Sequence, residues 1–348
     1  MNKETLDLFA CDKCSNDFHI EVYEKDSENY ISEGIIKCKQ CKLWYPIYDG
    51  IPNFLPSHLA DKSRRDSFSE KWRINFEEAT TPIDCESSND KKLQIDFFDA
   101  DTHIYDENME NTPFWKANDW NCLKEWLPNL GKGDLLLDVG CGSGRASIPF
   151  AKNGVKVIGL DISQQMVLRA KRKSEKLGIK DHVDYVVGDS ENLPFRQNSF
   201  DAVLAFGVLH HVPTPQKMLQ QMSKVLKNGG IYFGHENNKT ILRPIFDFIM
   251  CISRLWVEEA GNHPLISKSE LTIWANKVYL DVKIKSSVFF PPHLYNLLGY
   301  ENAKKLIAFS DNLLNRIPLV KNMGGILIIQ GKKTLDLIFT SRLTCLAQ

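Results

Sequence analysis

Residues 135–145 read LLLDVGCGSGR, an apolar run that ends at an acid and is followed by three glycines in five residues. A buried strand followed by glycines at alternate positions lets another molecule approach the backbone more closely than a Cβ atom permits. A nucleotide is the usual occupant of such a turn. Dinucleotide oxidoreductases, other nucleotide-binding folds and ordinary tight turns share the pattern, so the neighbouring segments must decide between them.

The residues after these glycines complete a strand–helix–strand unit. Residues 145–154 (RASIPFAKNG) predict a short helix that ends at Gly154, and residues 155–163 (VKVIGLDIS) predict a buried strand that ends at Asp161. An acid at this position, 21 residues after Gly140, can accept hydrogen bonds from both hydroxyl groups of a ribose. Up to this point, NAD and S-adenosylmethionine (SAM) fit the pattern equally well.

Later features distinguish the two cofactors. Asp138 precedes the glycines directly, where a carboxylate can hold the amino group of a methionine moiety, or order the loop through water, and would repel a pyrophosphate. The strand predicted within residues 182–195 (HVDYVVGDSENLPF) is followed by Asp189 and Ser190, which can hydrogen-bond the edges of an adenine ring. Residues 199–236 add a further strand, helix and strand. Together these features favour SAM.

Five segments resemble the motifs of the class I SAM-dependent methyltransferases, particularly the group often called type 11. They are DVGCGSGR, GLDIS, GDSENLPF, FDAVLAFGVLHHV and VLKNGG, and they follow one another within residues 131–236 in the order and approximate spacing of that family. The resemblance implies an α/β, Rossmann-like fold with a seven-stranded sheet. It also implies a SAM site formed by Asp138, Gly140, Cys141, Gly142, Gly144, Asp161, Ile162, Asp189, Ser190 and Phe206.

Two CxxC pairs near the start of the chain predict a metal site. They are formed by Cys11, Cys14, Cys38 and Cys41, whereas the other five of the nine cysteines are scattered. Each CxxC turn supplies two thiolates, and two such turns complete the tetrahedral shell of a zinc ion. The alternating segments FHIEVYE and YISEGIIK predict a hairpin that brings the two turns together. We expect a closed structural zinc site in a small β-rich domain, not a disulfide framework.

The segment after the second pair, KLWYPIYDGIPNFLP, resembles the end of the small zinc-ribbon proteins of the Trm112-like family. The resemblance covers about residues 5–57. Free-standing members of that family stabilise and activate methyltransferases of the translation apparatus. The resemblance therefore implies a helper domain that is fused to the enzyme it assists.

Composition changes along the chain predict its division into domains. Aromatic residues from Phe97 to Tyr105 interrupt a polar, irregular stretch. They either anchor this linker on the catalytic domain, which we favour, or cap the substrate pocket with Tyr105 facing the reacting centre. The predicted parts are a zinc ribbon (1–57), a linker and possible substrate cap (58–112), a methyltransferase domain (113–335) with a lid insertion at about 237–290, and a tail (336–348).

The lid insertion contains ILRPIFDFIMCISRLWV, which predicts an apolar helical stripe with a bend near Pro244. We expect this stripe to face the core as a lid; the alternative is a membrane-surface helix, whose usual basic flank is thin here. Either structure suggests an acceptor with apolar area. The stripe comprises Ile241, Ile245, Phe248, Ile249, Ile252, Leu255 and Trp256.

His210 and His211 follow the fourth strand of the methyltransferase pattern and are candidates for orienting the acceptor or removing its proton. The alternative is that they only pack at the end of the strand. His235 and Glu236, at the tip of the next strand, are rival candidates. The stretch from Ala205 to Val208 lacks the Asn-Pro-Pro-Tyr-like segment associated with methylation of amides and base amines, which weighs against such acceptors.

Charge and hydropathy set outer limits on function. The net charge of −1 and pI near 6.8 show no basic bias, so nucleic-acid binding is possible but not indicated. No secretory signal or transmembrane segment is predicted, and we expect a cytoplasmic protein. The predicted function is methyl transfer from SAM to a small or lipid-like acceptor, at oxygen or carbon. Alternatives are an RNA or protein methyltransferase and a non-catalytic zinc-ribbon interaction protein; the oligomeric state is open.

Overall fold

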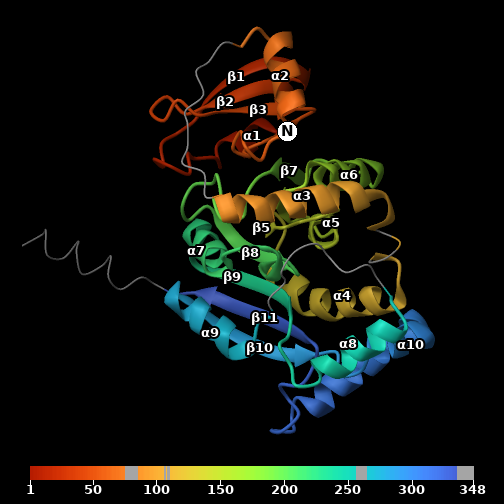
Figure 1. The fold of residues 1–348 in the computed structure, drawn as a ribbon. Coiled ribbons are helices and arrows are strands. Elements are labelled where there is room, and N and C mark those ends of the chain that lie inside the picture. Colours follow the sequence, from red (N-terminus) through yellow and green to blue (C-terminus); the bar gives the residue numbers. More distant parts are fainter. Residues whose placement is uncertain (75–84, 106, 108–109, 256–264, 335–348) are drawn as a thin grey trace, which may run out of the picture.

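The computed structural model describes residues 1–74, 85–105, 107, 110–255 and 265–334, without the side chains of residues 85–88 and 101–104. The predicted tail and Trp256 lie outside the described residues. Within them the chain forms two sheets, which Figure 1 shows as separate bodies joined by helices. The larger sheet has seven strands in the order β10-β11-β9-β8-β5-β6-β7, and this confirms the predicted α/β class I methyltransferase fold.

The first sheet has four antiparallel strands in the order β1-β2-β3-β4. The predicted hairpin is confirmed, because His19 pairs with Lys37 and Ser27 pairs with Tyr30. The last two strands are joined at Asp49 and Gly50, which both have positive φ angles, as a tight hairpin turn requires. The elements are α1 (Lys3–Leu6), β1 (His19–Ser27), β2 (Tyr30–Lys37), β3 (Trp44–Tyr48) and β4 (Ile51–Pro52).

Strands β5 to β9 of the larger sheet run parallel, as expected for buried strands connected by helices. The last strand in the sequence, β11, inserts antiparallel between β9 and β10. The apolar segments that predicted these strands therefore supply the centre of the core. The strands are β5 (Leu135–Val139), β6 (Lys156–Asp161), β7 (Val183–Val187), β8 (Phe200–Phe206), β9 (Leu226–Asn237), β10 (Leu280–Ser287) and β11 (Ile326–Lys333).

Helices cover both faces of this sheet. One core cluster joins it to α7 (Pro215–Val225) and α9 (Lys268–Lys277). A second cluster lies on the opposite face, where the helices carry large apolar side chains such as Phe114, Trp126 and Phe150. The helices of this face are α4 (Pro113–Trp126), α5 (Ser147–Lys152), α6 (Gln164–Lys176) and α10 (Pro292–Leu314); the short 3-10 helices are η2 (Leu127–Asn129) and η3 (Leu209–His211).

Two helices occupy the predicted linker. Helix α2 (Lys62–Lys71) packs on the first sheet, where Phe68 joins a cluster with Trp44 and the Arg65 guanidinium lies 3.8 Å from the centre of the Trp44 ring. Helix α3 (Cys85–Tyr105) runs along α6, and Asp99 accepts a hydrogen bond from Ser163 at the start of that helix.

The small sheet contacts the large one at strand β7. Asn53 forms a parallel bridge with Val187, and the amide of Phe54 donates to the Val187 carbonyl at 2.8 Å. On the other side of the loop that follows β7, the amide of Ala10 donates to the Pro194 carbonyl at 3.1 Å. The first domain thus holds both ends of the loop formed by residues 188–193.

Helix α8 (Arg243–Ile252) corrects two expectations about the lid insertion. Pro244 lies in the first turn and begins the helix instead of bending it, because proline is tolerated there. The apolar stripe does not face the core: the exposed fractions are 54% for Ile245, 66% for Phe248 and 72% for Ile252. The helix contacts the rest of the protein through its other side. No helix within the described residues is long and apolar enough to span a membrane.

Candidate active site

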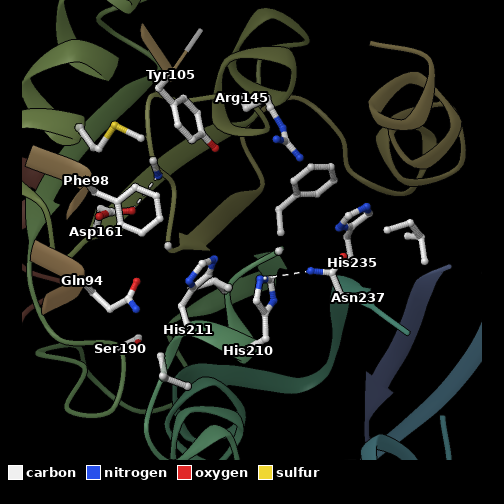
Figure 2. Close-up of a pocket in the computed structure, with 18 of the residues that line it drawn as sticks. Gln94, Phe98, Tyr105, Arg145, Asp161, Ser190, His210, His211, His235 and Asn237 are labelled. Atoms are coloured by element: carbon white, nitrogen blue, oxygen red, sulfur yellow. Dashed lines mark hydrogen bonds between the residues drawn. The ribbon is translucent and has the colours of Figure 1, made fainter. Parts of the chain in front are cut away.

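A cavity of about 500 Å³ lies at the carboxyl ends of the parallel strands β5, β6, β8 and β9, where ligands bind in open α/β sheets. Helix α3 closes one side with Gln94, Phe98 and Tyr105, and α8 closes another with Phe246 and Met250. Figure 2 shows the two adjacent histidines that follow β8 on one wall and Arg145 on the opposite wall. Of the predicted site residues, Tyr105, Gly140, Gly142, Asp161, Ile162, Asp189, Ser190, Phe206, His210 and His211 line it.

The glycine loop between β5 and α5 is shaped by its backbone. Gly140, Gly142 and Gly144 all have positive φ angles, a region that disfavours other residues. A Cβ atom on Gly140 would lie 2.4 Å from a methyl group of Val208, whereas on Gly142 the nearest atom would be 3.7 Å away. Gly140 therefore makes room for protein packing, whereas a Cβ atom on Gly142 would make only an ordinary contact at the cavity wall. This distinction was not evident from the motif.

Asp161 is held rigidly at the end of β6. One carboxylate oxygen accepts the amide hydrogen of Gly142 at 2.8 Å and the other accepts that of Ser163 at 2.9 Å. Burial raises the pKa of Asp161 to about 6, although these two hydrogen bonds oppose the shift. A fixed acceptor at this wall fits a ribose hydroxyl group.

Asp138, at the end of β5, and Cys141 and Gly144 of the glycine loop do not line the cavity. Asp138 is completely buried, and its Oδ2 atom accepts a hydrogen bond from Ser147 at 2.5 Å. Its other oxygen has no hydrogen-bond partner among the described residues, and burial raises the pKa of this carboxyl group to about 7. A direct contact between Asp138 and a methionine amino group stays a prediction.

A buried lysine from the linker reaches the predicted adenine site. Lys91 of α3 places its Nζ atom 2.8 Å from Asp189 and 2.5 Å from Glu191, and all three side chains are buried. The same Asp189 carboxylate accepts from the Asn192 side chain at 2.6 Å. The sequence analysis missed Lys91, because a lysine in a polar stretch gives no sign of burial. The contact makes α3 part of the cavity wall.

His210 forms a buried pair with a carboxylate from the neighbouring strand. Its Nδ1 atom lies 2.6 Å from Glu236, whose other oxygen accepts the backbone amides of Val208 and Leu209 at 2.9 and 2.7 Å. The Nε2 atom lies 3.3 Å from the side-chain nitrogen of Asn237 (Figure 2). Glu236, which the sequence offered as a rival to His210, is its partner. A carboxylate at Nδ1 fixes the ring and favours a proton acceptor at Nε2.

The second predicted histidine packs differently from the first. The ring centres of His210 and His211 lie 4.1 Å apart, and Phe98 of α3 contacts the His211 ring edge-on at 5.4 Å. Tyr105 lies near the same Phe98 ring, 6.4 Å away. His211 therefore contacts the aromatic side of α3, which Phe98 and Tyr105 form at the cavity.

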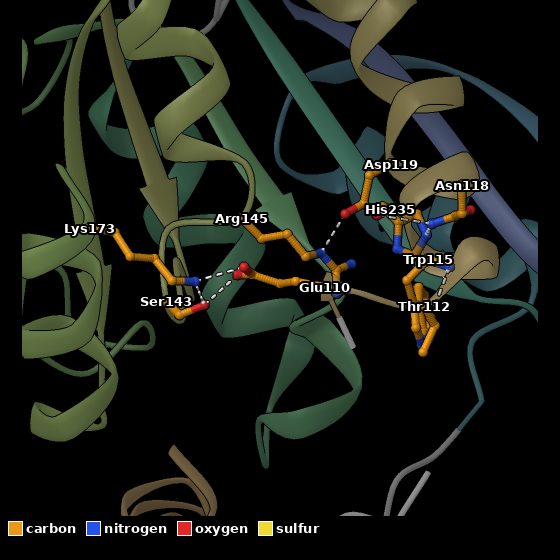
Figure 3. A network of polar contacts seen from close by, with 9 residues as sticks. All are labelled: Glu110, Thr112, Trp115, Asn118, Asp119, Ser143, Arg145, Lys173 and His235. Atoms are coloured by element: carbon orange, nitrogen blue, oxygen red, sulfur yellow. Dashed lines mark hydrogen bonds and ion pairs between the residues drawn. The ribbon is translucent and has the colours of Figure 1, made fainter. Parts of the chain in front are cut away.

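Arg145 joins a polar network on the far wall (Figure 3). Its Nε atom lies 3.0 Å from Asp119 of α4, and its guanidinium group lies 4.7 Å from the centre of the Phe206 ring and 5.1 Å from that of Trp115. Burial raises the pKa of Asp119 to about 6, against the attraction of Arg145. No role was predicted for Arg145, although it ends the glycine motif.

The neighbouring His235 is neutral near pH 7. Burial, reinforced by the positive charge of Arg145, lowers its pKa well below the usual value. The side-chain nitrogen of Asn118 lies 2.9 Å from its Nε2 atom, and its ring stacks on Phe206 with centres 4.6 Å apart. This histidine is therefore held as a neutral, packed wall residue.

The four predicted zinc ligands converge in the first domain. The sulfur atoms of Cys11, Cys14, Cys38 and Cys41 all lie within 4.8 Å of one another. The amide of Cys41 points to the Cys38 sulfur at 3.4 Å, as expected for a CxxC turn with inward amides. Four soft donors at this separation fit a tetrahedral zinc ion, and the cluster can hold one.

Comparison with known proteins identifies the larger domain. Residues 137–234 match the family described as "Methyltransferase domain". A sterol 24-C-methyltransferase of Eremothecium gossypii is 38% identical over 108 residues, which are 31% of this chain and 29% of that protein. A 27-O-demethylrifamycin SV methyltransferase of Amycolatopsis mediterranei is 40% identical over 109 residues, which are 31% of this chain and 40% of that protein. The chain thus matches less than half the length of these relatives.

Among solved structures, the [4+2]-cyclase SpnF has a similar fold, with a TM-score of 0.50 and 19% identity over 71% of this chain and 97% of that one. The strand order, the glycine loop and the family match define a class I SAM-dependent methyltransferase domain. In this chain it follows a four-stranded domain whose four cysteines lie together and can hold a metal ion.

Proposed function

We propose that the protein transfers a methyl group from SAM to a small or lipid-like acceptor, with His210 as the general base. The observation that carries the proposal is the buried pair of His210 and Glu236 at the cavity wall. The names of the two relatives support it, since one methylates a sterol at carbon and the other a rifamycin at oxygen. The histidine favours a hydroxyl acceptor, because an alcohol oxygen must lose its proton to become a nucleophile.

The residues of the cavity fit SAM in three parts. We assign Asp161 to the ribose hydroxyls, Asp189 with Ser190 to the adenine, and Gly142 to the backbone beside the methionine moiety. Arg145, the buried cation on the opposite wall, is suited to a carboxylate and is assigned to that of the methionine moiety. Bound SAM supplies an electrophilic methyl group.

In the reaction, the protein's own residues align the methyl donor with the acceptor and move one proton. Glu236 holds the proton of His210 on Nδ1, so that Nε2 accepts the hydroxyl proton as the acceptor oxygen takes the methyl group. The Asn237 amide lies 3.3 Å from Nε2 and gives up this contact when the hydroxyl group donates its proton there. Helices α3 and α8 supply two walls of the cavity, and alignment of the donor and the acceptor between them contributes most of the rate gain.

The division of the chain is part of the proposal. Residues 1–57 hold a structural zinc ion on the four cysteines, and residues 113–335 carry methyl transfer. Residues 58–112 connect them and contribute α3 to the cavity. The insertion at about 237–290 contributes α8 as a second wall.

The test begins with methyl-labelled SAM and fractionated cell extract, with the label sorted into lipid, RNA, protein and small-molecule pools. Label in the lipid or small-molecule pool is expected; label in RNA or protein alone would contradict the acceptor class. With the acceptor in hand, His210→Asn and Glu236→Gln should lower kcat roughly 10²- to 10⁴-fold and leave the SAM Kd unchanged. A full kcat in His210→Asn would refute the base. SAM binding without any labelled acceptor would favour a non-catalytic interaction protein.

A further inference from the structure

We propose that helix α8 and the start of α10 form a docking surface for an anionic lipid bilayer. The proposal rests on the proposed function only in its choice of a lipid-like acceptor; the surface itself is argued from exposure and charge. It assigns a role to the apolar stripe that the sequence analysis expected to find in the core.

Four residues of the stripe form an exposed patch along α8 and the turn before it. Ile245, Phe248 and Ile252 are spaced by three and four residues, which places them on one face of α8, and Ile241 lies in the turn before the helix. Their exposed fractions range from 54% to 78%. Large apolar side chains that gather in one exposed patch mark an interaction site, since scattered ones are the rule on other surfaces.

The patch continues onto the first turns of α10. The ring of His293 contacts the Ser253 carbonyl at the end of α8, with 2.5 Å between Nε2 and the oxygen. Leu297 follows His293 by one helical turn, so it projects on the same side, and its exposed fraction is 84%. The two helices lie side by side in Figure 1, at the end of the molecule away from the ribbon.

The opposite side of α8 lines the cavity through Arg243, Phe246 and Met250. One short helix therefore separates the exposed patch from the space that contains His210. A lipid-like acceptor that leaves a bilayer beside α8 has the shortest route into this cavity. This arrangement suits a lipid surface that supplies a lipid-like acceptor to the cavity.

Charge around the patch matches an anionic surface. Lys239 lies just before the patch, and Thr240 donates a hydrogen bond at 2.8 Å to the carbonyl of Met323, two residues after Lys321. Arg254 follows α8, and Lys321 lies close enough to Lys268 to help lower its pKa, after the larger effect of burial. Each basic side chain near an anionic bilayer contributes about 1 kcal/mol. Apolar contact and positive charge together are the two signals that reversible membrane binding requires.

The experiment measures co-sedimentation of the full chain with vesicles of phosphatidylcholine alone and with added phosphatidylglycerol. We expect binding to the anionic vesicles that is at least several-fold tighter than to the neutral ones and is weakened by salt. Phe248→Glu and Ile252→Glu should each reduce this binding about tenfold or more. Phe309→Glu is the matched control, because Phe309 is also 66% exposed but lies farther along α10; it should bind as the unchanged protein does.

Thermal unfolding and SAM affinity verify that the variants remain folded. Failure of the unchanged protein to bind either vesicle overturns the proposal, and so does equal binding by Phe248→Glu. A dimer in sedimentation that Phe248→Glu dissociates, without vesicle binding, assigns the patch to a second copy of the chain instead. The assay contains no acceptor and requires no turnover, so its failure would leave the proposed methyl transfer untouched.

Discussion

Asp161, the proposed ligand of the ribose, titrates close to neutral pH. Its carboxylate is fixed by two amides, and burial raises its pKa to about 6. The nearby Asp99 adds to the shift by repulsion. Because the folded chain binds this proton more tightly than an unfolded one, the stability it contributes is present in acid and is lost as the pH rises from about 4 to about 6.

We expect SAM binding to depend on pH in the opposite direction. Only the ionised carboxylate can accept hydrogen bonds from two ribose hydroxyls, and one pH unit below the pKa about a tenth of Asp161 is ionised. The Kd for SAM should therefore rise about tenfold between pH 7 and pH 5, as measured by calorimetry. Asp161→Asn should bind weakly with a flat profile. A Kd for the unchanged protein that stays constant across this range would contradict the assignment.

Arg145 gives a second prediction at this scale. If its buried cation holds the methionine carboxylate, the protein should bind SAM about tenfold or more tightly than decarboxylated SAM. Arg145→Gln should lose this preference while binding decarboxylated SAM almost as before. Equilibrium binding of both compounds to both proteins measures the difference. A preference that survives in the variant would place the carboxylate elsewhere.

Asp161 and His210 were predicted from sequence because each follows an apolar strand, and the ends of parallel strands meet at one edge of a sheet. Lys91, Asp119 and Arg145 were missed as functional residues, for a physical reason. Their importance comes from burial and from partners that are distant in the sequence, and neither leaves a local pattern. The pairing of His210 with Glu236 likewise requires the β8–β9 register.

Among the elements, α3 is held to the methyltransferase domain by the buried ion pairs of Lys91. Lys91→Met would leave Asp189 and Glu191 buried without their cation, which costs about 3–5 kcal/mol for a broken buried pair. We expect a lower Tm and faster dissociation of SAM, measured by thermal unfolding and stopped-flow fluorescence. Lys92→Met, at the exposed neighbouring position, is the control and should change neither. An unaltered Tm in Lys91→Met would show that the pairs do not hold α3.

Helix α8 shows that apolar spacing predicts a helix but not the direction in which its apolar side faces. Its apolar spacing predicted a helix correctly, but the spacing is the same whether the stripe meets a core or solvent. The stripe faces solvent because the opposite side of α8 packs on the protein, where Phe246 and Met250 line the cavity. For the strands no such ambiguity arose, because β5 and β8 are apolar on both faces and must be central.

In the molecule as a whole, the zinc ribbon and the cofactor site share one loop. Residues 188–193 carry Asp189 and are held at both ends by Phe54 and Ala10 of the first domain, and Ala10 is adjacent to Cys11, a proposed zinc ligand. Loss of the metal should therefore weaken the contact between Ala10 and Pro194, which supports the end of this loop. The ribbon's influence on the cavity is mechanical, through backbone hydrogen bonds.

We expect about one zinc ion per chain by metal analysis. Removing it with a chelator should lower the Tm and weaken SAM binding about tenfold, because a closed four-cysteine site supplies folding energy to its domain. Restoring zinc should reverse both effects, which separates metal loss from irreversible damage. A metal-free protein with unchanged Tm and SAM affinity would show that the two sites are independent.

The contact between Asn53 and Val187 also bears on solubility. Strand β7 is the last strand of the seven-stranded sheet, and the residues around Asn53 and Phe54 occupy part of its outer side. An uncovered strand edge offers free amides and carbonyls to other chains and promotes aggregation. A methyltransferase domain produced without residues 1–57 should therefore be recovered mostly as insoluble material. Such a result would mean that the first domain protects the larger one from self-association.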